Sequence, residues 1–358
     1  MPTTLVLRDS KLYSSTTSLL HRTIGAGAIN WPALALARFI LAFIVVASHA
    51  LRYTDAPGPL FWLSRFSAFN AIIGFLLISG LSIGKSLLKD SDGYYKRRAQ
   101  RIYPVYLVSI ALQYLIIPEA LSGKFFLLLF TNVFFLNQIT TSISYVGPAW
   151  TLALEVWLYA LAPFLLKLSY KNLLYLIGLS FASYVVYTCG RTLFHWPYYS
   201  GTTYGINLPL LAFIWIAGFL LATFEQRIKT TSFLIALILS GHFVLSLLIE
   251  IGAKIKNHRL ASFMDENGLN FAFEAICLAF IYYVVISNRT LPTFSATSKK
   301  VFNFLGNISY PLYLSHYVIL VLCHKNHLTH WFILVSCCLA VSCLIYWLFD
   351  FYSKRRAG

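Results

Sequence analysis

Long apolar blocks alternate along the chain with short polar or basic segments. Each block approaches the roughly 18–20 apolar residues that span the hydrocarbon core of a bilayer. The blocks predict about ten transmembrane helices in an all-α polytopic membrane protein. They lie near 33–50, 67–84, 103–118, 149–166, 172–188, 207–223, 232–250, 269–287, 308–324 and 330–350.

The apolar segment from Phe125 to Asn137 is too short to be counted among these spans. We interpret it as a re-entrant or interfacial piece between the third and fourth spans, because counting it as a span would reverse every helix after it. The first 22 residues lack the apolar core of a cleavable signal peptide, so the first span is expected to stay in the protein.

Composition agrees with a membrane protein, since 58% of the 358 residues are hydrophobic and only 11% are charged. The net charge of +16 does not indicate nucleic-acid binding, because the basic residues form short clusters between apolar blocks. With ten spans, 19 of the 28 Lys and Arg residues fall on one side and 8 on the other. The positive-inside rule then places both termini in the cytoplasm.

This reading divides the chain into a cytoplasmic tail (1–32), a membrane domain (33–350) and a short basic cytoplasmic tail (351–358). The six cysteines show no paired spacing typical of a zinc site or a disulfide framework. We therefore expect no metal site.

Ionisable residues inside apolar spans are costly and usually functional. Arg38 and His49 lie in the first span and are eleven positions apart, which puts them on one helix face about 16 Å apart along the axis. A histidine there can accept a proton from a hydroxyl group. The alternative is that His49 is an interfacial histidine and that Arg38 extends to lipid headgroups.

A second cluster, YYKRRAQRIYP, places Arg98 and Arg101 on one helix face at the cytoplasmic boundary. Arginine side chains match phosphate geometry, so a nucleotide-bearing donor such as coenzyme A could bind there. Charge alone favours the alternative, an anchor for anionic lipid.

Glu155 lies about six residues into a span, where a carboxylate could have a catalytic role by orienting or charge-pairing with a histidine such as His49. The alternative is a buried carboxylate that pairs with a neighbouring arginine. In LGNISYPLYLSHYVIL, Ser309 and Tyr310 are predicted to open a span after a Gly–Asn loop. His316 is two helical turns beyond Ser309, so the two share a face without contact. The alternative for His316 is a role in helix packing only.

Together these segments resemble the membrane acyltransferase-3 family, which includes O-antigen and exopolysaccharide O-acetyltransferases. The resemblance covers nearly the whole chain. Its motifs are Arg38 and His49 with ten residues between them, FLLISG at Phe75–Gly80, Arg98 and Arg101 before Pro104, WTLALE at Trp150–Glu155, and SYPLYLSH at Ser309–His316.

The resemblance implies an acyl-coenzyme A donor, usually acetyl-coenzyme A, and a hydroxyl acceptor on a surface-polysaccharide or lipid-linked sugar. It implies a catalytic role for His49, donor-binding roles for Arg38, Arg98 and Arg101, and site-lining roles for Ser309, Tyr310 and His316. It also implies a bacterial inner membrane. Some relatives carry a further soluble domain, so we expect this chain to act through its membrane domain, alone or with a separate partner protein.

Two alternatives remain open from the residues. The first concerns the class of protein, which could be a polytopic transporter of a sugar or a lipid-linked intermediate with Glu155 and His316 as proton relays. Aromatic residues near the outer face could stack on a sugar, although an interfacial belt is the more ordinary role. These are Trp62, Trp196, Tyr198, Tyr199 and Tyr204.

Overall fold

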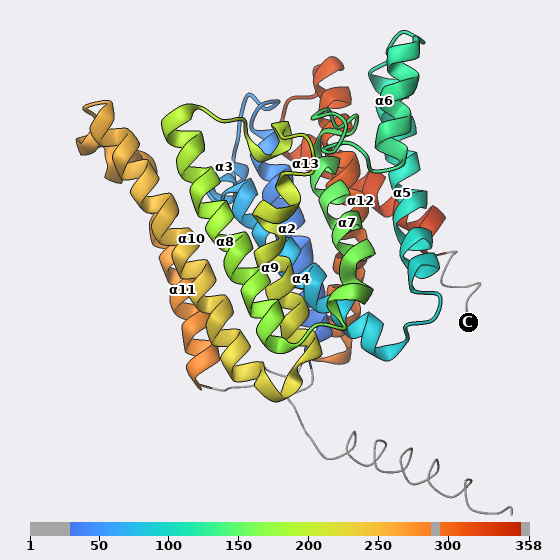
Figure 1. The fold of residues 1–358 in the computed structure, drawn as a ribbon. Helices are drawn as coiled ribbons and strands as arrows, with labels where there is room; N and C mark the ends of the chain where they lie inside the picture. The colour runs from blue at the N-terminus through green and yellow to red at the C-terminus, as the bar shows by residue number, and fades with distance from the viewer. Residues whose placement is uncertain (1–28, 288–293, 352–358) are drawn as a thin grey trace, which may run out of the picture.

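Ten long α-helices run up and down through the molecule in the computed structural model, which describes residues 29–287 and 294–351 (Figure 1). They are α2 (Trp31–Ala50), α4 (Ala68–Lys89), α5 (Tyr94–Ile116), α7 (Trp150–Leu165), α8 (Tyr170–Phe194), α9 (Asn207–Thr223), α10 (Ile228–Lys256), α11 (Leu269–Ser287), α12 (Ala296–Lys325) and α13 (Trp331–Ile345). Each predicted span overlaps one of these helices. The described residues form no β-strand, only two isolated bridges. The all-α prediction is therefore confirmed.

Eight of the helical segments in the described residues are long and apolar enough to cross a membrane. Two of the ten predicted spans do not reach this standard. The helix α9 has 17 residues and is almost entirely buried at the centre of the bundle, while α5 begins with basic turns. The number of ten spans therefore stays a prediction.

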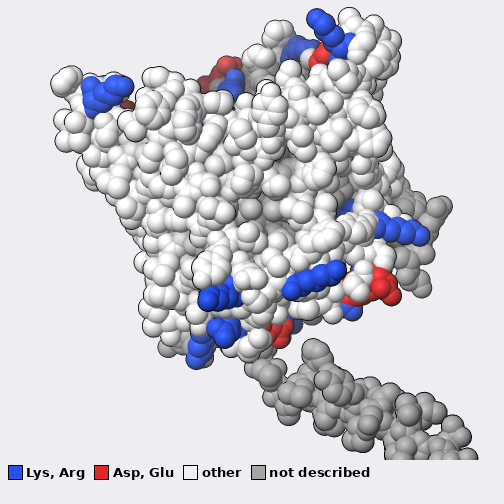
Figure 2. Space-filling model, viewed as in Figure 1, with Lys and Arg blue, Asp and Glu red and all other residues white. Residues whose placement is uncertain are grey.

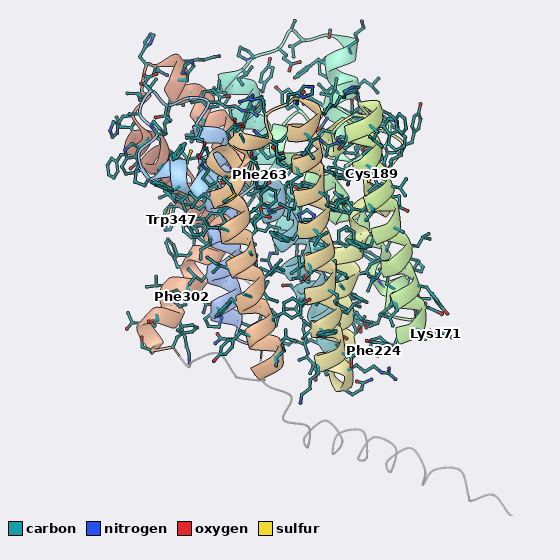
Figure 3. All side chains as sticks on the ribbon, turned by 90° about the vertical axis from the view of Figure 1, so that its left-hand side faces the viewer. Lys171, Cys189, Phe224, Phe263, Phe302 and Trp347 are labelled. Carbon is teal, nitrogen blue, oxygen red and sulfur yellow. The ribbon has the colours of Figure 1, made fainter. Side chains whose placement is uncertain are left out.

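Short connections define the two ends of the bundle. We call the end at which α5, α8 and α10 begin the inner end, since the sequence predicts that it faces the cytoplasm, and the opposite end the outer end. Figure 3 labels Lys171 and Phe224 near the inner end and Cys189 and Phe263 towards the outer end. In the view of Figure 2 the charged side chains gather at the two ends, with an uncharged band between them. This is the distribution expected of a membrane-spanning bundle.

The outer end carries most of the short elements. They are α3 (Leu60–Ser64), α6 (Gly123–Val133), the 3-10 turns η1 (Gly147–Ala149), η2 (Tyr199–Gly201) and η4 (Leu260–Ser262), and the π-helix η5 (Met264–Gly268). At the inner end, η3 (Glu225–Arg227) joins α9 to α10, and α13 continues into the π-helix η6 (Tyr346–Phe351). The predicted re-entrant segment corresponds to α6, whose relation to a membrane stays a prediction. The two predicted tails fall largely outside the described residues.

Glycine allows the closest helix crossing, between α4 and α9. A Cβ atom on Gly80 would lie 1.9 Å from the backbone oxygen of Trp215, and one on Gly218 would lie 2.1 Å from that of Leu77. No larger side chain fits at either position without a shift of the backbones. Small residues at helix contacts are typical of membrane bundles, where close backbone approach replaces the hydrophobic effect.

The start of α12 corrects the sequence analysis. Ser309 and Tyr310 do not open a span after a loop, because Gly306 and Asn307 lie inside a helix that begins at Ala296. Gly306 is needed for packing and not for a turn. A Cβ atom there would come within 2.6 Å of the Cβ atom of Ala35 on α2.

Candidate active site

A cavity of about 120 Å³ lies between α2, α4, α5, α7 and α12. We call it the arginine cavity, because Arg38, Arg98 and Arg101 line it together. Glu155, Ser309 and Tyr310 are also among its lining residues. Six of the eight predicted site residues therefore share one cavity, although they come from four helices.

The three arginines lie towards the inner end of this cavity. Arg98 and Arg101 occupy the first two turns of α5, and Arg38 is in the second turn of α2. Arg98 donates a hydrogen bond to the Ser86 hydroxyl over 2.9 Å, but its buried Nε has no partner. The ion pairs among the described residues involve none of these three arginines. The cavity therefore presents positive charge that no acidic side chain pairs directly.

Glu155 contacts a different group from the one expected. Its carboxylate accepts a short hydrogen bond from the Tyr159 hydroxyl and a 3.3 Å bond from Ser79. Ser79 also lies 2.9 Å from the Tyr159 hydroxyl and accepts a bond from the Trp215 indole over 3.2 Å. The hypothesis that Glu155 orients His49 is not supported, because the carboxylate is used within this cluster.

The partner of His49 is His316. The His49 Nδ1 and the His316 Nε2 are 2.8 Å apart, although 267 positions separate the residues in the chain. His316 is completely buried. Its Nδ1 lies 2.8 Å from the Tyr313 carbonyl oxygen and 3.1 Å from that of Leu312.

These contacts determine the tautomers when both imidazoles are neutral. A carbonyl oxygen only accepts, so the His316 Nδ1 carries the hydrogen and its Nε2 is an acceptor. The His49 Nδ1 must then donate to it. The His49 Nε2 is left with a lone pair, which is the form that a general base requires.

The histidine pair adjoins the arginine cavity through Tyr313. This residue lines the cavity, and its ring centroid is 6.2 Å from that of His316. Its hydroxyl lies 2.7 Å from the Thr151 hydroxyl, which lines the same cavity. The cavity therefore extends from the arginines to the neighbourhood of the histidine pair.

Ser309 and Tyr310 are wall residues of this cavity. The Ser309 hydroxyl donates to the Gly306 carbonyl of its own helix over 2.7 Å, so it does not pair with His316. Tyr310 donates to the Ile102 carbonyl on α5 over 3.1 Å. The sequence analysis missed Ser79 and Tyr313, although both lie inside the motifs that carry the family resemblance.

The described residues contain no group of three or more His, Cys, Asp or Glu side chains that could hold a metal ion. A fold of long apolar helices around an arginine-lined cavity with a paired histidine defines a polytopic membrane protein with a buried polar site.

The comparison with known families identifies this class more closely. A family model described as an acyltransferase domain matches residues 31–351. The chain therefore belongs to the acyltransferase-3 family and is a membrane acyltransferase. It is also 26% identical over 251 residues to "Putative acetyltransferase ORF330" of Acidianus two-tailed virus, which covers 68% of each chain. No solved structure matches.

Proposed function

We propose that the protein transfers an acyl group, normally acetyl, from cytoplasmic acyl-coenzyme A to a hydroxyl of a surface-polysaccharide or lipid-linked sugar. The observation that carries this proposal is the arginine cavity, which joins three arginines at the inner end to the surroundings of a hydrogen-bonded histidine pair. The family supplies the acyltransferase chemistry.

The arginines would bind the phosphates of the donor. Guanidinium groups form paired hydrogen bonds with phosphate oxygens, and these bonds are strong where both partners are charged. Arg98 and Arg101 lie one helical turn apart at the inner mouth, and Arg38 lies further along the wall. We propose that Glu155 offsets part of the positive charge of these arginines, since its carboxylate lines the same cavity.

His49 would act as the general base. Its Nε2 accepts the proton of the acceptor hydroxyl while the hydroxyl oxygen attacks the thioester carbonyl carbon. The carbon–sulfur bond then breaks, and the coenzyme A thiolate takes the proton back from His49. A general base of this kind contributes about a hundred- to ten-thousand-fold to the rate. His316 holds the Nδ1 hydrogen of His49 and so keeps the Nε2 free.

The test is incorporation of label from acetyl-coenzyme A into the cell-envelope glycan of membranes that contain the protein. The native protein should incorporate label and His49→Ala should not. His324→Ala is the matched control, because His324 is an exposed histidine at the outer end and lines neither the cavity nor the pair. Equal incorporation by native protein and His49→Ala would refute the assignment. Mass spectrometry of the labelled glycan would identify the acyl group.

A further inference from the structure

A second cavity, of about 240 Å³, lies at the outer end between α7, the start of α9 and the loop after α6. We call it the amide cavity, because three carboxamide residues line it, Asn137, Gln138 and Asn207. These three are at most 2% exposed. The volume is just below the usual range of small-molecule sites, about 300–1,000 Å³.

The polar groups of the amide cavity are only partly paired with each other. Asn207 donates to the Gln138 side-chain oxygen over 3.1 Å, and the Asn137 amide nitrogen donates to Ser144 over 2.8 Å. The Gln138 amide nitrogen donates to the carbonyls of Ser142 and Ser200, each over 3.1 Å, so Gln138 fixes the cavity wall. The Asn137 Oδ1 is buried and has no partner in the described structure. If the oxygen and nitrogen of the Asn137 side-chain amide exchange places, the nitrogen is the group left unpaired. A buried polar group of this kind needs a ligand or water.

The lining chemistry selects an uncharged polyhydroxyl ligand. No charged side chain is among the described residues that line the cavity, so an anionic or cationic ligand would be left without a counter-charge. An acyl chain would leave the amides unsatisfied. Carboxamides both donate and accept, which matches sugar hydroxyls. Trp157 and Tyr204 add aromatic surface, and Tyr204 is 85% exposed at the mouth.

The backbone around the cavity is also unusual. Gln138 and Tyr204 have positive φ angles, 72° and 57°, although neither is glycine. Backbone hydrogen bonds hold the two strained segments together, from Tyr204 to Ile139 over 2.9 Å and from Gly205 to Gln138 over 2.8 Å. Strained residues of this kind cluster at binding sites.

One loop connects the amide cavity to the surroundings of His49. After Gln138 this loop reaches Gly147, where a Cβ atom would lie 4.0 Å from the Tyr317 ring. The Tyr317 ring centroid is 6.2 Å from that of His49. Nine residues extend at most about 30 Å. The loop therefore keeps the amide cavity within a distance that one oligosaccharide can span, while the two cavities share no described lining residue.

We propose that the amide cavity binds one uncharged sugar unit of the acceptor, away from the hydroxyl that receives the acyl group. This inference rests on the proposed function, because it takes the acceptor to be a glycan. It makes Asn137 and Asn207 determinants of acceptor specificity, with Gln138 positioning Asn207. Binding energy from such a remote unit can raise the rate at the reacting centre.

The experiment is titration of the purified full-length protein with maltotriose, mannotriose and the trimer of N-acetylglucosamine, followed by tryptophan fluorescence. At least one trisaccharide should give a saturable change, and Trp157→Phe should remove it. Asn207→Leu should weaken binding at least tenfold, because it removes a hydrogen-bonding group of similar size. Asn132→Leu is the matched control. Asn132 is a buried amide of the same region that bonds only backbone groups and does not line the cavity.

The absence of saturable binding by all three trisaccharides would overturn the proposal. Native affinity in Asn207→Leu would also overturn it, because this would show that the cavity holds water only. An equal loss of sugar affinity in Asn132→Leu would overturn it as well. If Asn207→Leu does not fold, Tyr204→Ala at the exposed mouth decides, with a tenfold loss supporting the site and native affinity overturning it. Failure of acetyl transfer with intact sugar binding would refute the proposed function alone. Intact transfer without sugar binding would refute this inference alone.

Discussion

The hydrogen bond between His49 and His316 can be tested by replacing His316 with residues that keep or remove its acceptor. His316→Leu fills similar space but cannot accept the Nδ1 hydrogen of His49. His316→Gln keeps an acceptor oxygen at about the same reach as the Nε2. The two variants therefore separate the volume of the buried side chain from its role in orienting the base.

The expected magnitude follows from the tautomer argument. Without an acceptor, His49 can carry its hydrogen on either nitrogen and can rotate, and the general-base contribution of about 10²- to 10⁴-fold is reduced. We expect His316→Leu to lower kcat by about 10²- to 10³-fold, which corresponds to about 2.7–4 kcal/mol of transition-state stabilisation. His316→Gln should recover at least about tenfold of this loss. The KM for acetyl-coenzyme A should change little, because neither histidine lines the arginine cavity.

The assay is the initial rate of label transfer from acetyl-coenzyme A to envelope glycan, with the amount of folded protein measured by size-exclusion chromatography in detergent. A folded His316→Leu protein within about threefold of the native rate would refute the role of His316 in orienting His49. Equal rates for the Leu and Gln variants, both far below native, would show that His316 is needed for packing and not for orientation.

Two further predictions concern the donor and the packing. Arg101→Ala should raise the KM for acetyl-coenzyme A by tenfold or more with a similar kcat, since a charge-assisted hydrogen bond is worth about 1.5–3 kcal/mol. The control Lys96→Ala lies on the same helix but outside the cavity, so it should leave this KM unchanged. Equal KM changes in the two variants would refute donor binding by Arg101. Gly218→Ala should lower the thermal unfolding temperature because its Cβ atom meets the Leu77 backbone oxygen, whereas Gly178→Ala, with no neighbour within 4 Å, should not. An unchanged unfolding temperature for Gly218→Ala would contradict the close crossing of α4 and α9.

The helical fold was predictable because the length and apolar composition of each block can be read from the local sequence. The beginning of α12 was not, since Gly306 and Asn307 look like a turn when only local propensity is considered. The same glycine is required where α12 crosses α2, as its contact with Ala35 shows. A packing requirement between two helices distant in sequence leaves no local pattern, so the loop prediction was wrong.

The site was predictable in its residue types but not in its pairings. An arginine or a histidine inside an apolar span is conspicuous by itself, which is why Arg38, His49 and His316 could be selected. Which residue bonds to which depends on how α2 and α12 are rotated against each other. The carboxylate of Glu155 was the natural candidate for a histidine partner, yet the structure places it against Tyr159. The amide cavity is formed from a loop and two helices, and none of its three carboxamide residues lies in one of the motifs.

The arrangement of the two cavities around α7 bears on why the protein is a transferase and not a carrier. Thr151, Glu155 and Tyr159 face the arginine cavity, whereas Ala153 and Trp157 face the amide cavity, about half a turn away on the same helix. Among the described residues, none lines both cavities. A transporter needs one site that opens to each side in turn. Under the proposed function, two separate sites suit two different substrates, the acyl donor and the acceptor. In the proposed function the acyl group is transferred at the histidine pair beside Tyr313, and the amide cavity only holds a remote unit of the acceptor.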